Sequence, residues 1–186
     1  MTDIVARWGG VILTALAAVP LAGLAAWALA RWRGTWRAPL LEVAMVLGTL
    51  PWLWMILRPN GTGRSLTPVP LTDLADLGGA STSTVVEQLG GNLLVFAALG
   101  CCLPMRWAAF GRLWRVALVA AGASVAVEVL QYALAIGRHS SVDDVLLNAA
   151  GAVLAAACSR RWWARGRGPD PAVGRAGKPL SCPHRA

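Results

Sequence analysis

Five stretches of about 20 mainly apolar residues divide the chain, and their length constrains its fold more than any other feature. They are residues 9–30, 39–57, 85–104, 113–136 and 143–163. A helix of roughly 20 apolar residues spans the ~30 Å hydrocarbon layer of a bilayer. With 56% hydrophobic and only 14% charged residues in 186, the chain is too apolar for a soluble domain of this size. We therefore predict an all-α, multi-pass protein of the cell membrane with five transmembrane helices.

The basic residues predict how these helices are oriented. With the N-terminus outside the cell, 13 of the 17 lysines and arginines lie on the cytoplasmic side. Loops left in the cytoplasm keep their basic residues, so the arrangement with the N-terminus outside and the C-terminus inside is favoured. The net charge of +8 is then an orientation signal, and no nucleic-acid partner is needed. A cleaved signal peptide at the first window is disfavoured, because cleavage would leave Arg31, Arg33 and Arg37 outside.

The composition between the windows predicts the domain organisation. Residues 1–57 hold two N-terminal transmembrane helices, and residues 58–86 form an extracellular loop rich in Pro, Gly, Ser and Thr. That loop predicts turns and a short interfacial helix near "LTDLADL". Residues 87–163 form a three-helix core, and residues 164–186 have the composition of a disordered, basic cytoplasmic tail.

Strongly polar side chains fall at one depth near the outer ends of the last three windows. Inside lipid such groups cost several kcal/mol unless they face protein or water. Glu128 and Gln131 lie three positions apart and therefore on one helix face, with Ser124 one turn earlier. We predict a pocket open to the extracellular side, with Arg138 on the adjoining loop. Its lining would be Asn92, Glu128, Gln131, Asp143, Asp144 and Asn148.

A purely structural interpretation stands beside this one. Arg138 could neutralise Asp143 or Asp144, and Ser141 or Asp143 could cap the last helix. Asn92 and Asn148 could serve as hydrogen-bonded links between helices. Function is favoured most at Glu128, because a bare carboxylate at that depth is costly.

Two further contacts are predicted to be structural. Gly151 and Ala155 in "NAAGAVLAAA" permit close approach of a neighbouring helix. Glu42, near the cytoplasmic end of the second window, is expected to form an ion pair with Arg31 or Arg37.

The sequence indicates neither a metal site nor a disulfide framework. Cys101, Cys102 and Cys158 lie within spans, where thiols act as small apolar fillers. Cys182 and His184 on the tail are too few for a metal site. Any cofactor, and the oligomeric state, stay unknown at this stage.

The order and spacing of three motifs resemble the VanZ-like family of bacterial membrane proteins, named for a protein associated with low-level teicoplanin resistance. The motifs are "GGNLLVFAALG", "EVLQ" and "GRHSSVDDVLLNAAG", and the resemblance covers about residues 60–158. Ala98 stands where the family usually has proline, and Thr67 where it has asparagine. The matching positions are Asn92, Phe96, Gly100, Glu128, Gln131, Arg138, Asp143, Asp144, Asn148 and Gly151. The resemblance implies a cell-envelope role, with Phe96, Gly100 and Gly151 as structural positions, and brings no established biochemical activity.

Three functions stay open on this basis. The first is a membrane protein that lowers susceptibility to glycopeptide or lipoglycopeptide compounds. The second is an intramembrane enzyme acting on a lipid-linked cell-wall precursor, with Asn92, Gln131 and Asn148 binding the substrate. Its Glu128 would be a general acid or base, Arg138 would pair with phosphate, and Asp143 with Asp144 would offer oxygen ligands for Mg²⁺. The third is a small transporter or scaffold in contact with membrane lipids.

Overall fold

The computed structural model describes residues 2–59 and 63–164, and for 2–8, 11, 12, 63–65 and 138–140 it describes the backbone alone. The predicted tail begins at residue 164, and its residues 165–186 lie outside the described ranges. The helices are α1 (Thr2–Arg33), α2 (Arg37–Ile56), α3 (Thr72–Asp76), α4 (Thr82–Val85), α5 (Gly91–Val95), α6 (Ala97–Arg106), α7 (Leu113–Leu134) and α8 (Val142–Cys158). The strands are β1 (Gly63–Thr67) and β2 (Ile136–Ser141), and short 3₁₀ turns cover Leu77–Gly79, Ala108–Phe110 and Arg160–Trp162.

The apolar windows coincide with helices, which confirms the predicted all-α, membrane-spanning class. Among the described residues, four helical segments are long and apolar enough to cross a bilayer: Leu13–Arg33, Arg37–Ile56, Thr82–Arg106 and Leu113–Leu134. Large apolar side chains on them face outward, such as Leu118 with 63% of its surface exposed. The fifth predicted helix exists as α8, whose 17 residues extend over roughly 26 Å. Whether α8 completes a fifth span stays a prediction.

The third window is helical but interrupted twice. After α4 the chain makes a π-helical turn over Val86–Gly90, and between α5 and α6 Phe96 leaves the helical region with φ −111° and ψ 15°. The helix then resumes, with the Gly100 N–H donating to the Phe96 carbonyl at 2.8 Å. The break is therefore present although Ala98 replaces the usual proline.

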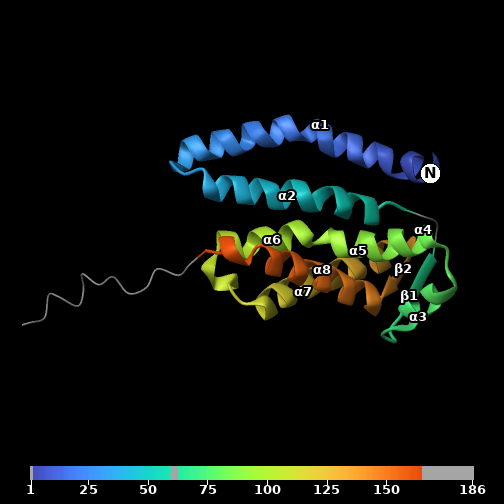
Figure 1. The fold of residues 1–186 in the computed structure, drawn as a ribbon. Coiled ribbons are helices and arrows are strands. Elements are labelled where there is room, and N and C mark those ends of the chain that lie inside the picture. Colours follow the sequence, from blue (N-terminus) through green and yellow to red (C-terminus); the bar gives the residue numbers. More distant parts are fainter. Residues whose placement is uncertain (1, 60–62, 165–186) are drawn as a thin grey trace, which may run out of the picture.

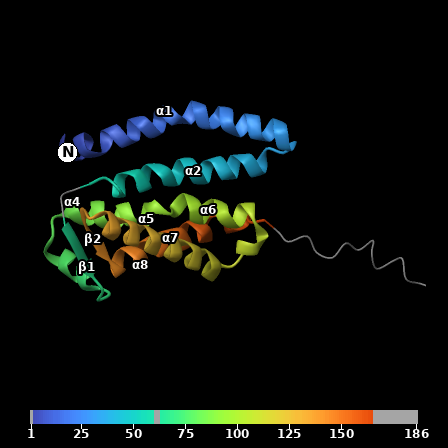
Figure 2. The same ribbon diagram turned by 180° about the vertical axis from the view of Figure 1, so that it is seen from behind.

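The helices form a layered bundle in which chain neighbours pack side by side (Figures 1 and 2). A turn at Gly34, which takes φ +68°, reverses the chain between α1 and α2. Next, α2 lies on α5 and α6, and α8 packs against both α6 and α7. The main buried apolar cluster lies between these inner helices and consists of Val95, Phe96, Val116, Ala120, Ala152 and Ala156.

Two glycines allow α8 to approach the third window at backbone distance. A Cβ on Gly100 would overlap the carbonyl oxygen of Ala152, and a Cβ on Gly151 would overlap that of Leu93. Small residues at helix interfaces permit such contact, and the lost side-chain volume is replaced by backbone packing. The predicted close approach at Gly151 is thus confirmed. Gly151 contacts the backbone of Leu93 in α5.

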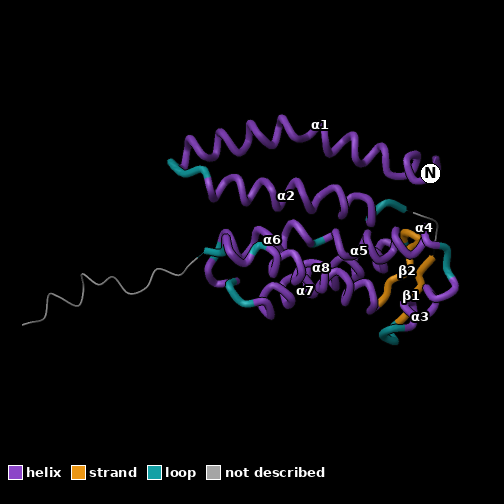
Figure 3. Tube along the Cα trace, in the orientation of Figure 1, coloured by secondary structure: helices purple, strands orange, loops and turns teal. Residues whose placement is uncertain are grey.

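One end of the bundle carries a feature that the sequence analysis missed. β1 and β2 pair in parallel, with Leu66 opposite Ser140 and Thr67 opposite Ser141 (Figure 3). The chain leaves α7 through Ala135 and Gly137, both with positive φ, which turns it into β2. We call this the strand end.

The opposite end gathers arginine and tryptophan, and we call it the arginine-rich end. Six arginine side chains there lie over tryptophan rings, among them Arg106 over Trp107 and Arg161 over Trp162. Indole rings and basic side chains are typical of a membrane–water interface. The predicted orientation would place this end in the cytoplasm.

Glu42 forms ion pairs at the arginine-rich end, but not with the predicted partners. Its carboxylate accepts hydrogen bonds from Arg33 Nη1 at 2.6 Å and from Arg106 Nε at 2.8 Å. Arg37 instead donates to the Trp162 carbonyl at 2.5 Å. The predicted pairing with Arg31 or Arg37 was wrong because α6, distant in sequence, brings Arg106 to the same level.

Candidate functional site: a polar cluster at the strand end

Polar side chains from the third window, α7 and α8 meet in the half of the bundle next to the strands. We call this set the polar cluster, and it consists of Asn92, Ser124, Glu128, Gln131, Asp143, Asp144 and Asn148. Ser124, Gln131, Asp143 and Asn148 are buried, and the other three are half-buried. Polar groups at this burial are stable only when hydrogen-bonded, so their partners reveal what each one does.

Asn92 and Asp144 join the third window to α8. The Asn92 Nδ2 donates to the Asp144 Oδ1, and both side chains are half-buried. Asn92 lies two residues after the end of the π-helical turn over Val86–Gly90, and such turns occur often at functional sites. The predicted convergence of these two residues on one level is therefore seen as a direct contact.

Asn148 and Ser124 form the most deeply buried pair of the cluster. The Asn148 Nδ2 donates to the Ser124 Oγ at 2.8 Å, and the two residues are 3% and 0% exposed. The Asn148 Oδ1 has no hydrogen-bond partner within the described part of the chain. A buried acceptor left without a donor costs about 1–3 kcal/mol, so this oxygen is suited to accept from a bound molecule or a water.

Glu128 lies one helical turn after Ser124, on the same side of α7. The residue is half-buried, and its Oε2 atom is shielded from solvent. Because Ser124 is hydrogen-bonded to Asn148, these three residues place a carboxylate and an amide oxygen on facing helices. This combination of acceptors can bind a ligand that offers N–H or O–H groups.

Asp143 and its neighbour Asp144 have different hydrogen-bond partners. Asp143 is 1% exposed, and its two oxygens accept backbone N–H bonds from Leu71 at 2.5 Å and Leu74 at 3.1 Å. Leu71 has φ 68° and directly precedes α3, so Asp143 caps that short helix and holds the loop onto α8. The short helix predicted near "LTDLADL" is thus present as α3, and its N-terminus is tied to the bundle by a side chain from a remote helix. Its place at the membrane interface stays a prediction.

Ser141 caps α8, which was one of the two predicted possibilities. Its Oγ accepts the Asp143 N–H at 3.1 Å. Asp143 and Asp144 contact opposite neighbours, the loop and the third window, so they do not converge on one point. Across the described residues no three His, Cys, Asp or Glu side chains are grouped as a metal site would need.

Gln131 is hydrogen-bonded to α2, outside the polar cluster. Its Nε2 donates to the carbonyl of Ile56, the last residue of α2, at 2.7 Å. Gln131 therefore links α7 to the N-terminal helix pair. The backbone of Arg138 lies in β2, whereas its side chain is outside the described part of the structure, and its pairing with phosphate or carboxylate stays a prediction.

The partners missed by the sequence analysis are main-chain groups. The N–H groups of Leu71 and Leu74 and the carbonyl of Ile56 complete the hydrogen bonds of Asp143 and Gln131. A main-chain group is present at every position, so no residue type in the sequence marks these three. Only the backbone path of the loop and of α2 brings them to the cluster.

The architecture is that of a helical membrane protein with a buried polar cluster assembled by its last three apolar helices. The chain belongs to the VanZ/LLP1 family, whose model matches residues 45–163. The matched range begins within α2 and includes every residue of the polar cluster, together with Phe96, Gly100 and Gly151. No curated protein and no solved structure matches the chain.

Proposed function

We propose that this protein lowers the susceptibility of the bacterial cell membrane to glycopeptide or lipoglycopeptide compounds such as teicoplanin, and that the polar cluster is the binding site through which it does so. Membership of the VanZ/LLP1 family supports a cell-envelope role. The observation that carries the assignment to the cluster is the Asn148 Oδ1, a buried acceptor with no donor among the described residues.

The chemistry of the cluster suits an amide-rich ligand. The Glu128 carboxylate and the Asn148 Oδ1 are acceptors, and peptide compounds carry many N–H donors. A hydrogen bond to a charged acceptor in such a partly dry site is worth about 1.5–3 kcal/mol. Asp143 and Gln131 contribute indirectly, because they hold the loop and α2 against the helices that form the site.

Growth of a sensitive bacterial host that expresses the full chain tests this function. We expect the inhibitory concentration of teicoplanin to rise with the natural chain and to return to the host value with Glu128→Gln or Asn148→Leu. Asp76→Asn, which removes an exposed carboxylate at the same end, is the matched control and should retain the effect. Equal susceptibility of the empty host and the host with the natural chain would refute the proposal.

An intramembrane enzyme acting on a lipid-linked cell-wall precursor is the second candidate. The burial of the Glu128 Oε2 favours it, because a buried carboxyl is suited to act as a general acid or base. The engagement of both Asp143 oxygens by the loop disfavours a Mg²⁺ site shared with Asp144. Turnover of a polyprenyl phosphate by the purified natural chain, abolished by Glu128→Gln, would favour this candidate over the first.

A small transporter or scaffold is the third candidate, with Glu128 carrying a proton. Proton-coupled uptake into vesicles containing the natural chain, absent with Glu128→Gln, would support it. The same vesicles with Asp76→Asn provide the matched control.

The binding role also requires the strand end to face the cell exterior. Single cysteines at Ala80 and Ala109, introduced into a cysteine-free variant, report on the two ends through exposed positions. We expect a membrane-impermeant thiol reagent to label position 80 but not position 109 in intact cells. The opposite pattern would reverse the predicted orientation.

A further inference from the structure

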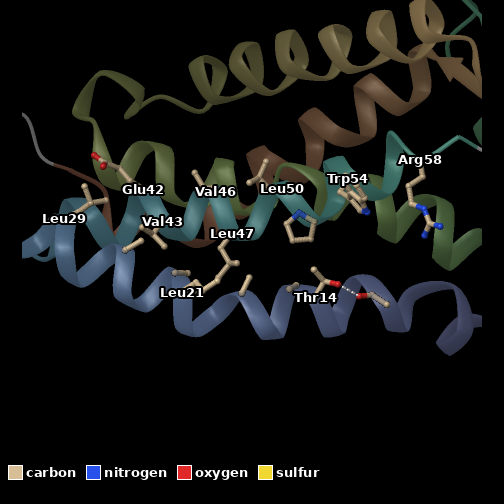
Figure 4. Close-up of a pocket in the computed structure, with 16 residues that line it drawn as sticks. Thr14, Leu21, Leu29, Glu42, Val43, Val46, Leu47, Leu50, Trp54 and Arg58 are labelled. Carbon is tan, nitrogen blue, oxygen red and sulfur yellow. Dashed lines mark hydrogen bonds between the residues drawn. The ribbon is translucent and has the colours of Figure 1, made fainter.

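A large apolar cavity lies between α1 and α2, away from the polar cluster (Figure 4). Its volume is about 1020 Å³, which is at the upper end of the range for small-molecule sites. Small side chains line the α1 side, among them Gly10, Ala15, Ala18 and Ala22, whereas longer ones such as Leu47 and Leu50 come from α2. We call this space the α1–α2 groove.

The groove exists because α1 does not close onto α2 along its whole length. Pro20 lies inside α1, where it removes one helical hydrogen bond and bends the helix. Ala26 and Ala30, on the stretch after Pro20, are the only described residues of α1 that are fully buried. The alanines nearer the strand end are too short to reach α2, so the space between them is not filled by protein.

The walls of the groove decide what kind of molecule can fill it. They are almost entirely apolar, and an apolar cavity does not hold water well. Within the described ranges, four helical segments are long and apolar enough to cross a bilayer, and α1 and α2 carry two of them. Hydrocarbon is therefore the surrounding solvent, and an acyl chain is the occupant that matches the walls.

The two ends of the groove differ in charge. At one end Glu42 is paired with Arg33 and Arg106, so its charge is already compensated. At the other end Arg58 is exposed and makes no ion pair with any described residue. Glu42 and Ile56, the last residue of α2, are 14 positions apart, or about 21 Å of helix, which is most of the ~30 Å hydrocarbon layer.

The tryptophan Trp54 indicates that the end of the groove at Arg58 lies at the level of lipid headgroups. Trp54 lines the groove one turn before Arg58 and is 70% exposed (Figure 4). Tryptophan prefers the interfacial layer of a membrane. An uncompensated guanidinium beside it forms charge-assisted hydrogen bonds with a phosphate.

We propose that the α1–α2 groove binds a phospholipid with a net negative headgroup, whose acyl chain lies along the groove and whose phosphate is held by Arg58. This inference does not depend on the proposed role of the polar cluster. The two sites are separate, because no residue of the cluster lines the groove. The protein would then carry a resident lipid between its first helix and the rest of the bundle.

Photo-crosslinking of the full chain tests the proposal directly. The protein is reconstituted in phosphatidylcholine vesicles that contain a minor fraction of phosphatidylglycerol with a photoreactive acyl chain. We expect crosslinks in peptides from α1 and α2, and about fivefold less crosslinking with Arg58→Gln, since one basic residue near anionic lipid contributes that much to affinity. The double variant Ala18→Leu with Ala22→Leu should fill the groove and abolish the labelling.

Two matched variants separate the groove from general contact with lipid. Arg112→Gln removes an exposed arginine at the other end, and Ala126→Leu adds a leucine on the exposed side of α7. Both should label like the natural chain. The assignment of the headgroup would be overturned if a phosphatidylcholine probe crosslinked as strongly as the phosphatidylglycerol probe. It would also be overturned if Arg58→Gln crosslinked as strongly as the natural chain. If the folded variant with Ala18→Leu and Ala22→Leu were labelled as strongly as the natural chain, the groove would not be the lipid site.

Discussion

Two helix pairs in this molecule are rich in small residues, yet one is packed at backbone distance and the other is hollow. In the pair formed by α6 and α8, a single Cβ at Gly100 would overlap the backbone of Ala152. In the pair formed by α1 and α2, alanines on α1 face a cavity of about 1020 Å³. Small side chains therefore permit close approach without causing it.

The difference comes from what holds each pair together. The inner pair is tied by the Ser159 hydroxyl at the C-terminus of α8, which donates to the Cys101 carbonyl of α6 at 3.1 Å, and by the buried cluster around Phe96 and Ala152. The outer pair contains Pro20 and is clamped chiefly at one end, where Arg33 meets Glu42. α8 is hydrogen-bonded to the third window near both of its ends, by Asp144 to Asn92 and by Ser159 to Cys101, and stays close to it along its length. In contrast, α1 contains Pro20 and is clamped chiefly at one end.

Enlarging Ala152 should have the largest effect on this comparison. The residue is fully buried, and its backbone already contacts Gly100, so Ala152→Leu forces the helices apart. We expect a loss of about 3 kcal/mol in the free energy of unfolding, near the upper end for an overpacked core. The melting temperature of the detergent-purified protein, followed by tryptophan fluorescence, measures it.

Two variants control for a chain that fails to accumulate. Gly100→Ala tests the same contact from the other helix, because its Cβ would overlap the Ala152 backbone, and it should also lower the melting temperature. Ala150→Leu places the larger side chain on the exposed face of the same helix and should leave the melting temperature unchanged. A stable Ala152→Leu protein would mean that the inner pair is as loosely packed as the outer one.

Removing the Asp143 carboxylate should have the next largest effect, confined to the loop. Asp143→Ala leaves the N–H groups of Leu71 and Leu74 without their acceptors, at a cost of about 2 kcal/mol. Hydrogen exchange at these two amides should accelerate, while exchange in α7 stays slow. Asp76→Ala, from the exposed side of α3, should change neither. Unaltered protection in Asp143→Ala would show that the loop is held by other contacts.

Breaking the clamp of the outer pair should have a modest effect. Glu42→Gln weakens the ion pairs with Arg33 and Arg106, which are partly exposed, so we expect a loss below about 1 kcal/mol. The difference in melting temperature from the natural chain should shrink as salt is added, because salt screens exposed ion pairs. A loss that does not respond to salt would contradict an electrostatic clamp.

Filling the groove should have the smallest effect on stability. Ala22→Leu places the same side chain as Ala152→Leu on an alanine that lines the α1–α2 groove. We expect a change of about 0 kcal/mol, or slight stabilisation, because added apolar atoms gain contacts without displacing backbone. A melting temperature as low as that of Ala152→Leu would show that α1 and α2 are in close contact after all.

Several features of the site follow from the sequence because they depend on local spacing. The apolar windows predict the helices, and the spacing of Ser124, Glu128 and Gln131 predicts a shared face. The small residues around Gly151 predict close packing, which the overlap at Leu93 confirms. The Ser141 cap is also a local contact, two residues from its donor.

Other features involve partners that are far apart in the chain. Asp143 accepts from Leu71 and Leu74, about 70 residues earlier, and Gln131 donates to the Ile56 carbonyl. Glu42 pairs with Arg106 and not with the nearer Arg31 or Arg37. Side-chain spacing cannot predict these contacts, because each depends on which helices lie next to each other and at what level.

The sequence by itself determined that the chain forms long apolar helices and that its polar side chains gather towards one end, since helix length and side-chain periodicity are local properties. Tertiary structure alone decided the parallel pairing of β1 with β2, the partners of Asp143 and Gln131, and the hollow between α1 and α2. These depend on the packing of segments that are remote in the chain, where the bend at Pro20 and the backbone contact at Gly100 lead two alanine-rich helices to opposite outcomes.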